Sequence, residues 1–421
     1  MKSLRRFRPF PRPRLGHRLP SELRAGRVGR LAGALPGGVL DPGFETLLRR
    51  IDGSPIHRGN RVEVFTRGAD AFGAMCTALL GAREEILLES YILRDDATGR
   101  SFLEMLEGAT RRGVRVRVLA DAAGSFGTRR AFWREMAAHG IEVRLFHPLA
   151  KGLWNQVFRD HRKILVVDRR IGFTGGMNIG REYGSMPWSK PHKTWRDTHV
   201  RIEGPAAWEM AVVFAEGWRR ADGKPFDLPD LVAGPDAPPG AGILVLDSRP
   251  MRGHVESASV LAAIAGAARR TLWITNAYFA PGHAALKVLG AAARRGVDVR
   301  LLLPGSTDAP IVRHAGHGFY SALLASGVRV FEYQAAVLHA KSLVADDYVA
   351  VVGSSNLDFR SFYFNAECNL VILDQAAAEA LAVAFRTDLE QSNEIERAPW
   401  RARPPLHRLG DRLARQLAPL L

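Results

Sequence analysis

Two stretches of the chain share one pattern: DHRKILVVDRRIGFTGGMNIG at residues 160–180 and LHAKSLVADDYVAVVGSSNLD at residues 338–358. Both follow His-x-Lys-x4-Asp-x6-Gly-[Gly/Ser]-x-Asn. The chain has 13 histidines but only 8 lysines against 51 arginines, and these are its two His-x-Lys pairs. Composition alone would produce two complete copies in register very rarely. We therefore interpret the repeat as a duplicated functional unit.

The sequence around the motifs is duplicated as well. Apolar segments typical of buried strands, residues 86–91 and 272–278, each precede a helical stretch and a second strand, at 110–121 and 293–304. A further helix end and strand follow at 137–146 and 324–333. This alternation predicts parallel α/β units. The copies lie about 180 residues apart, which indicates a domain duplication and not a solenoid.

The predicted organisation follows from these boundaries. We expect a pseudo-two-fold axis between the halves, because that arrangement brings equivalent elements to one shared cleft. The expected segments are a basic N-terminal arm (1–40), a first domain (41–220), a Pro/Gly-rich linker (221–242), a second domain (243–398) and a basic amphipathic tail (399–421).

The paired motifs offer the functional groups that phosphoryl transfer needs. Residues two apart in an extended segment point to the same side, so each histidine and its lysine project together into the cleft. One imidazole attacks phosphorus, the other protonates the leaving alkoxide, and the lysines offset charge on the phosphate oxygens. The predicted catalytic set is His161, Lys163, Asp168, His339, Lys341 and Asp346, with Asn178, Asn356 and Ser354 as phosphate-binding residues.

Four carboxylates have expected supporting roles. A nucleophilic imidazole needs a partner on its second nitrogen. Glu367, which follows His339 by 28 residues, and Asp197, which follows His161 by 36, are the candidates, one in each half. Asp168 and Asp346 belong to the motif but stand at the end of a strand, so we expect them to order a turn. We predict no metal site and no cofactor, because the sequence has no acidic cluster or His/Cys group with ligand spacing.

The charge and the two ends of the chain bear on its partners. There are 59 Lys+Arg against 43 Asp+Glu, a net charge of +16, which favours anionic partners. We expect no signal peptide and no disulfide framework, and no transmembrane span, since no apolar stretch reaches the ~18–20 residues that cross a bilayer. The C-terminal segment 406–421 predicts a basic amphipathic helix that either docks on an anionic membrane or packs on the protein. Its leucines at helical spacing are Leu406, Leu409, Leu413, Leu417 and Leu420.

These motifs resemble the paired HKD motifs of the phospholipase D superfamily, over roughly residues 60–395. The phrases GGMNIGREY, WRDTHVRIEGPA, TNAYFAP and GSSNLDFRSFYFNAE resemble bacterial cardiolipin synthases of the type without N-terminal membrane spans. The resemblance implies an α/β fold of two duplicated phospholipase D-like α/β/α sandwich domains with one shared active site. It also implies a ping-pong reaction with His161 as the nucleophile and His339 as the general acid. Gly176 departs from Ser354 at the matching position, so the two halves are not identical.

The expected function is transfer of a phosphatidyl group to phosphatidylglycerol, without a metal ion, on the inner face of the cell membrane. Hydrolysis of phospholipid head groups is the first alternative. A nuclease of the same superfamily is the second, although we see no interleaved aromatic platform for nucleic acid. A non-catalytic binding protein is disfavoured because both motifs are intact. An internal pseudo-dimer needs no second chain.

Overall fold

The computed structural model describes residues 20–148, 157–188, 194–228, 239–249 and 256–418. The first half contains β1 (His57–Phe65), α3 (Gly68–Gly81), β2 (Glu85–Ser90), α4 (Ala97–Arg111), β3 (Arg115–Asp121), α5 (Arg130–Ala138), β4 (Glu142–Phe146), β5 (Arg159–Asp160), β6 (Lys163–Val167), β7 (Ile171–Gly175), β8 (His199–Glu203) and α6 (Pro205–Arg220). The second half contains β9 (Ala241–Ser248), α7 (Glu256–Ala267), β10 (Thr271–Asn276), β11 (Phe279–Ala280), α8 (His283–Arg294), β12 (Asp298–Pro304), α9 (Pro310–Ala325), β13 (Arg329–Tyr333), β14 (Lys341–Ala345), β15 (Val349–Gly353), β16 (Leu357–Asp358), α10 (Phe359–Tyr363), β17 (Asn365–Leu373), α11 (Gln375–Leu389) and β18 (Ser392–Glu394).

The two halves repeat one sheet order, as the duplication predicted. The first half runs β1-β8-β7-β6-β2-β3-β4 and the second runs β9-β17-β15-β14-β10-β12-β13. Within each half the three strands predicted to be parallel are parallel, β2-β3-β4 and β10-β12-β13. The motif strands β6 and β14 add to them antiparallel. Glycines with positive φ, Gly113 and Gly296, follow α4 and α8, where only a residue without a Cβ adopts this backbone easily.

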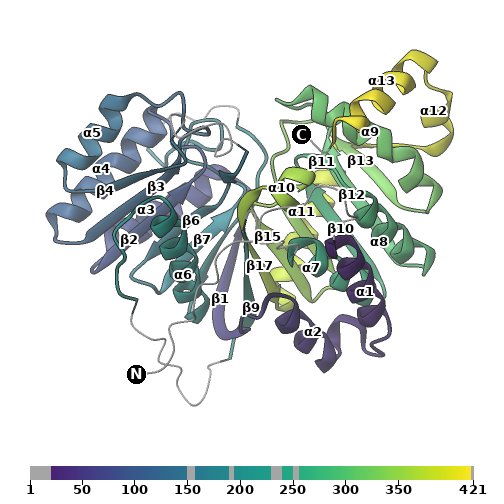
Figure 1. The fold of residues 1–421 in the computed structure, drawn as a ribbon, viewed down its shortest axis with the longest axis horizontal. Coiled ribbons are helices and arrows are strands. Elements are labelled where there is room, and N and C mark those ends of the chain that lie inside the picture. Colours follow the sequence, from purple (N-terminus) through teal and green to yellow (C-terminus); the bar gives the residue numbers. More distant parts are fainter. Residues whose placement is uncertain (1–19, 149–156, 189–193, 229–238, 250–255, 419–421) are drawn as a thin grey trace.

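The sheets of the two halves are continuous, a feature the sequence did not predict. β1 and β9 pair antiparallel across the pseudo-dyad, so a single sheet crosses the molecule (Figure 1). One layer of helices consists of α3–α5 in the first half and α7–α9 in the second. The other layer, α6 and α11, packs on one apolar cluster that contains strands of both halves. The α/β/α layering is as expected.

The N-terminal boundary differs from the prediction. Residues 20–40 are not a free basic arm, because α1 (Pro20–Gly33) packs along α7. Helix α2 (Pro42–Asp52) contributes Phe44, Leu48 and Ile51 to the core of the second half, not of the first. Figure 1 shows both helices, in purple, beside the green second half. An apolar helix face buries itself against the nearest uncovered apolar surface, and sequence order does not say which half provides it. Residues 1–19 of the predicted arm lie outside the described residues.

The C-terminal segment is helical, as predicted, and folds as α12 (Arg397–Ala402) and α13 (Pro405–Gln416). Helix α13 packs on α9 through the side that carries Asp411 and Ala414. Among the described residues, no helix is long and apolar enough to cross a membrane.

Candidate active site

Each motif histidine is positioned by backbone pairing with the other half. His161 follows β5, which pairs parallel with β17, and its N–H donates to the carbonyl of Ala366 at 2.9 Å. His339 follows a bridge between Leu338 and Arg196, and its N–H donates to the carbonyl of Arg196 at 2.7 Å. Each histidine therefore belongs to one half in sequence and is held by the other half in space.

The orienting carboxylates also cross between the halves, because each histidine contacts a carboxylate of the other half. His161 Nδ1 lies 3.1 Å from Glu367 Oε2, and His339 Nδ1 lies 2.7 Å from Asp197 Oδ2. Glu367 and Asp197 are thus the partners that we predicted, but counting residues within each half assigned each to the wrong histidine. The crossing follows from the backbone pairing, which brings the segment that precedes each carboxylate beside the opposite histidine. Both bonds use Nδ1, which leaves Nε2 of His161 for chemistry, whereas Nε2 of His339 lies 3.1 Å from Lys341 Nζ.

Burial and neighbouring charges shift the pKa values of the two histidines and their carboxylates. Burial, together with the neighbouring lysine, lowers the pKa of both imidazoles, that of His339 to about 4. Burial alone would raise the pKa of Glu367 and Asp197, but the nearby histidines and lysines hold both below their ordinary values. The carboxylates are therefore ionised at neutral pH.

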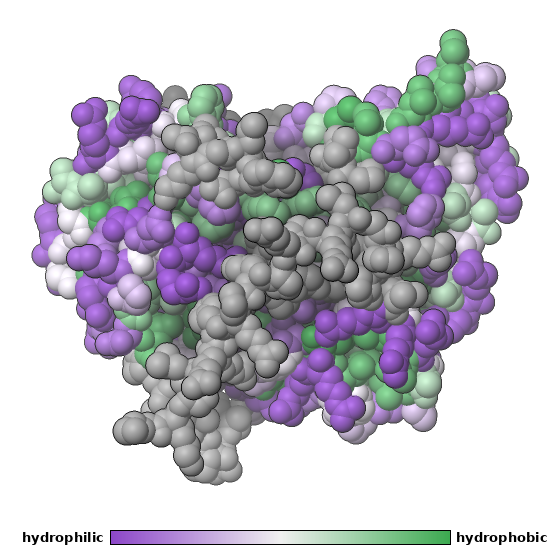
Figure 2. Space-filling model, viewed as in Figure 1, coloured by the Kyte–Doolittle hydropathy of each residue, from purple (hydrophilic) through white to green (hydrophobic). Residues whose placement is uncertain are grey.

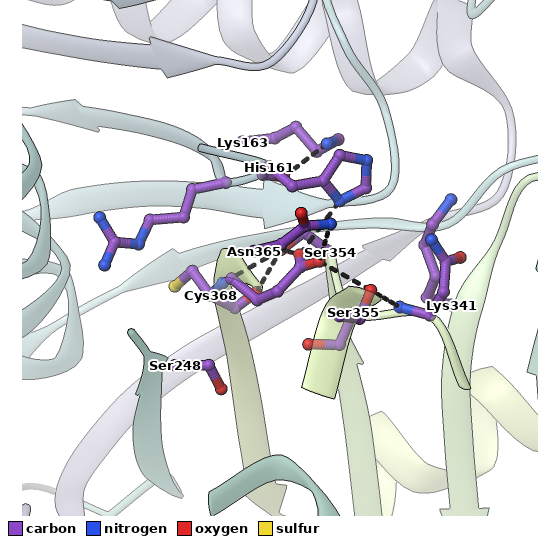
Figure 3. Close-up of polar contacts among 12 residues, drawn as sticks. His161, Lys163, Ser248, Lys341, Ser354, Ser355, Asn365 and Cys368 are labelled. Atoms are coloured by element: carbon purple, nitrogen blue, oxygen red, sulfur yellow. Dashed lines mark hydrogen bonds and ion pairs between the residues drawn. The ribbon is translucent and has the colours of Figure 1, made fainter. Parts of the chain in front are cut away.

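The two lysines, which we predicted to project into the cleft, are buried beside the rings, and neither lines the cavity into which the histidines open. Lys163 Nζ donates to the carbonyl of His161 at 2.6 Å, and Lys341 Nζ lies 2.9 Å from His339 Nδ1. Burial lowers the pKa of Lys163 to about 7 and that of Lys341 to about 8. Figure 3 shows His161 and Lys163 of the first half opposite Ser354, Asn365 and Lys341 of the second.

Ser354 has a different role from the predicted one. It is fully buried, and its hydroxyl donates to Glu367 Oε2 at 2.5 Å, so it faces the orienting carboxylate and not a phosphate. At the matching position a Cβ on Gly176 would lie 2.0 Å from Asp197 Oδ1. The two motifs therefore differ at this position because their neighbouring carboxylates differ. Asp197 occupies the space at Gly176, whereas Glu367 accepts a hydrogen bond from Ser354.

Asp168 and Asp346, which we included in the catalytic set and also expected to order turns, bind backbone N–H groups and do not line the cavity of the motif histidines. Asp168 accepts hydrogen bonds from the backbone N–H groups of residues 83–85, and Asp346 from those of residues 269–271. Both have positive φ, at 50° and 49°. Each orders the turn after its motif strand, as its position at a strand end suggested.

The two motif asparagines, which we predicted to bind phosphate, line the cavity that the motif histidines share. The amide of Asn178 is already engaged, because it accepts from the N–H of Ile92 at 3.0 Å and donates to the Tyr183 hydroxyl at 2.7 Å. The side-chain oxygen of Asn356 is buried and has no hydrogen-bond partner among the described residues. Rotation of that amide would present its NH2 group to a phosphate oxygen.

Both histidines open into one cavity of about 380 Å³. The motifs did not predict most of its wall, which includes Tyr91, Arg159, Tyr183, Trp195, Tyr278, Asp308, Arg360 and Asn365. Three of the aromatic rings pack around His339, with centroids 5.3–5.9 Å from its own. A sequence signal for several of these residues existed, since Trp195, Tyr278, Arg360 and Asn365 stand in the phrases that carry the family resemblance.

One set of side chains in the described residues could hold a metal ion. Ligand atoms of His314, His317 and Asp411 all lie within 4.8 Å of one another. This set joins α9 to α13, and none of its members lines the cavity that contains the two motif histidines.

Comparison with known proteins identifies the family to which the chain belongs. The family described as cardiolipin synthase, PLD-like domain matches residues 75–186 and 260–389, one motif in each segment. A cardiolipin synthase of Halalkalibacterium halodurans is 33% identical over 380 residues, which are 89% of this chain and 75% of that protein. Cardiolipin synthase A of Pseudomonas putida (strain GB-1) is 38% identical over 375 residues, 87% of this chain and 76% of that protein.

The similarity of folds is wider. The crystal structure of phosphatidylserine synthase from Haemophilus influenzae matches 89% of this chain and 97% of its own, with a TM-score of 0.69 and 13% identity. At this identity the match concerns the fold alone. It extends over both halves, which supports the continuous two-half architecture.

Proposed function

The chain belongs to the cardiolipin synthase family of phospholipase D-like proteins, and we propose that it transfers a phosphatidyl group to phosphatidylglycerol through a phosphohistidine. As a member of this family it is an enzyme of the phosphatidyltransferase type. One observation carries the mechanism: two histidines, one from each half, face a single cavity and are each bound through Nδ1 to a buried carboxylate.

In the first step, Nε2 of His161 attacks the phosphorus of a phosphatidylglycerol molecule. The bound phosphodiester is an anion and raises the pKa of His339 from its value of about 4 in the free site, so His339 enters this step protonated. The bond between phosphorus and the glycerol oxygen breaks, and His339 donates its proton to the departing glycerol. Glu367 stabilises positive charge on His161, while Lys163 and Lys341, buried beside the two histidines, offset negative charge on the phosphate oxygens. The product of this step is phosphatidyl-His161.

In the second step, a hydroxyl of a second phosphatidylglycerol attacks the same phosphorus. His339, now neutral, takes the hydroxyl proton, and the bond between phosphorus and His161 breaks. The product is cardiolipin, and both histidines return to their starting protonation. His339 thus acts as acid and then as base, for which the buried Asp197 is a suitable partner.

Helix α13 supports docking on an anionic membrane surface. Its leucine side is exposed, with Leu406 at 79% and Leu413 at 62%, although the opposite side packs on α9. Figure 2 shows apolar residues protruding at the upper right, where Figure 1 has α13. The two predicted outcomes for this helix are thus compatible, and we propose peripheral binding to the inner face of the membrane through these leucines and neighbouring arginines.

The docking proposal is tested with Leu409→Glu/Leu413→Glu against the matched control Leu80→Glu, an exposed leucine of α3. The amount of protein that sediments with phosphatidylglycerol vesicles should fall about tenfold or more for the double variant, because two leucine side chains no longer insert into the apolar phase. The control should bind like the parent protein. Equal binding of all three proteins would refute docking through α13.

The activity is tested by mass spectrometry of lipids after incubation with phosphatidylglycerol vesicles, beside a His161→Ala variant. Cardiolipin and glycerol in equal amounts, formed only by the parent protein, would support the proposal. Phosphatidic acid instead of cardiolipin would make the protein a phospholipase, in which water resolves the phosphohistidine. No lipid product, together with cleavage of single-stranded DNA or RNA, would favour a nuclease.

A further inference from the structure

We propose that Arg159 and Arg360 form a second anion subsite in the active-site cavity, which binds the phosphodiester of the acceptor lipid. This inference rests on the proposed function and specifies how the acceptor is chosen. Both arginines line the cavity that contains the motif histidines.

The two edges of the cavity differ in charge, although the halves are duplicated. Arg159 stands two residues before His161, and the equivalent position before His339 is Val337. Arg360 stands four residues after Asn356, and the equivalent position after Asn178 is Glu182. The reacting groups are therefore repeated, whereas the rim carries two arginines on one side and a valine and a glutamate at the matching positions. A symmetric substrate would not need such a difference.

The arginines are held at the cavity wall. Arg159 is 5% exposed, and its guanidinium lies 3.8 Å from Asp121 Oδ1 and donates to the carbonyl of His147. Arg360, in the first turn of α10, donates to the carbonyl of Val157 at 3.1 Å. Fixed guanidinium groups lose little entropy on binding and match the paired oxygens of a phosphodiester.

The opposite rim carries two carboxylates, Glu182 and Asp308, and a single arginine, Arg94. Glu182 accepts a hydrogen bond from Arg94 at 3.3 Å, and Asp308 accepts one from the Tyr278 hydroxyl at 2.8 Å. Carboxylates repel a phosphodiester and accept hydrogen bonds from the hydroxyls of a polyol. The charge difference therefore orients an acceptor that has hydroxyls at one end and a phosphate at the other.

The chemistry of the acceptor requires such a site. Only three carbon atoms separate the attacking hydroxyl of phosphatidylglycerol from the oxygen that bears its own phosphate. When the hydroxyl reaches the phosphohistidine, this second phosphate must lie against the wall of the same cavity, and its negative charge needs a cationic partner there. Free glycerol has the same hydroxyls and no phosphate, so it can accept the phosphatidyl group without the arginines.

The experiment compares these two acceptors. Vesicles of phosphatidylglycerol are incubated with deuterated glycerol, and one mass-spectrometric run measures both cardiolipin and labelled phosphatidylglycerol. Labelled phosphatidylglycerol reports phosphohistidine formation and transfer to a neutral acceptor. The proteins are the parent chain, Arg360→Gln, Arg159→Gln, Arg360→Lys and the control Arg386→Gln, an exposed arginine of α11 that pairs with Glu379.

We expect Arg360→Gln to slow cardiolipin formation about 10- to 100-fold and to change glycerol exchange less than about twofold, the loss typical of a charged hydrogen bond. Arg360→Lys should recover part of the rate, and Arg386→Gln should behave like the parent. Equal loss of both products in Arg360→Gln and Arg159→Gln would mean a structural role and overturn the inference, as would no loss of either. Failure of the parent chain to form cardiolipin would instead refute the proposed function.

Discussion

Glu367→Gln removes one negative charge from the site and keeps the shape of the side chain. In the parent protein Oε2 faces His161 and Ser354, while Oε1 accepts hydrogen bonds from Ser361 at 2.8 Å and Asn365 at 3.4 Å. The donor Nδ2 of Asn365 favours the glutamine oxygen at the Oε1 position. The glutamine NH2 group then faces Nδ1 of His161, which must become an acceptor, and the ring proton moves to Nε2.

The size of the effect follows from this tautomer. Nε2 with a proton has no lone pair for phosphorus, and the positive charge that develops on the ring loses its carboxylate. Replacement of an orienting carboxylate by an amide costs about 10⁴-fold in a Ser-His-Asp triad. We expect turnover to fall about 10³- to 10⁴-fold, equivalent to about 4–5 kcal/mol of transition-state stabilisation.

The assay separates the two histidines by their leaving groups. Glu367→Gln and Asp197→Asn are compared on phosphatidylglycerol and on a phosphatidyl nitrophenol, whose leaving group needs no proton. With His161 as the nucleophile, Glu367→Gln should be slow on both substrates, whereas Asp197→Asn should recover most of its rate for release of nitrophenolate. Turnover of phosphatidylglycerol by Glu367→Gln within about threefold of the parent would refute the role of the crossed pair.

Three further perturbations test the supporting residues. Asp168→Ala leaves three backbone N–H groups without their acceptor and should lower the free energy of unfolding in urea by about 2–4 kcal/mol. An unchanged urea midpoint together with lost activity would return Asp168 to the catalytic set. Ser354→Ala should lower kcat about tenfold at unchanged KM, because the hydroxyl contacts Glu367 and not substrate, and a raised KM alone would contradict this. The pH profile of kcat/KM should fall from about pH 7 upward, because the pKa of Lys163 is lowered to about 7 and that of Lys341 to about 8, and deprotonation of either lysine removes a charge that offsets the phosphate. A profile that is flat to pH 10 would exclude both lysines from phosphate binding.

The reacting groups could be predicted from the sequence because the duplication repeats them. Either His161 or His339 alone would carry little information, whereas two copies in register imply one cleft between two halves. The parallel strands and the order of helices followed from apolar periodicity in the same way. These features depend on local pattern, which a single sequence contains.

Features that depend on contacts between distant segments could not be predicted. Glu367 is the partner of His161 because β5 pairs with β17, across about two hundred residues of chain. The core position of Phe44 in the second half depends on which helix leaves an apolar face uncovered. Arg159 and Arg360 fall outside the spacing pattern of the motifs, and only the fold brings them to one wall.

The covalent intermediate tests the central claim most directly. His339→Asn and His161→Asn are each mixed with phosphatidylglycerol, and their tryptic peptides are analysed by mass spectrometry under conditions that preserve phosphoramidates. The account predicts a phosphatidyl adduct on the peptide that contains His161 in the His339→Asn protein and none in the His161→Asn protein. Absence of an adduct from both variants and from the parent protein during turnover would mean direct transfer between lipids and would contradict it.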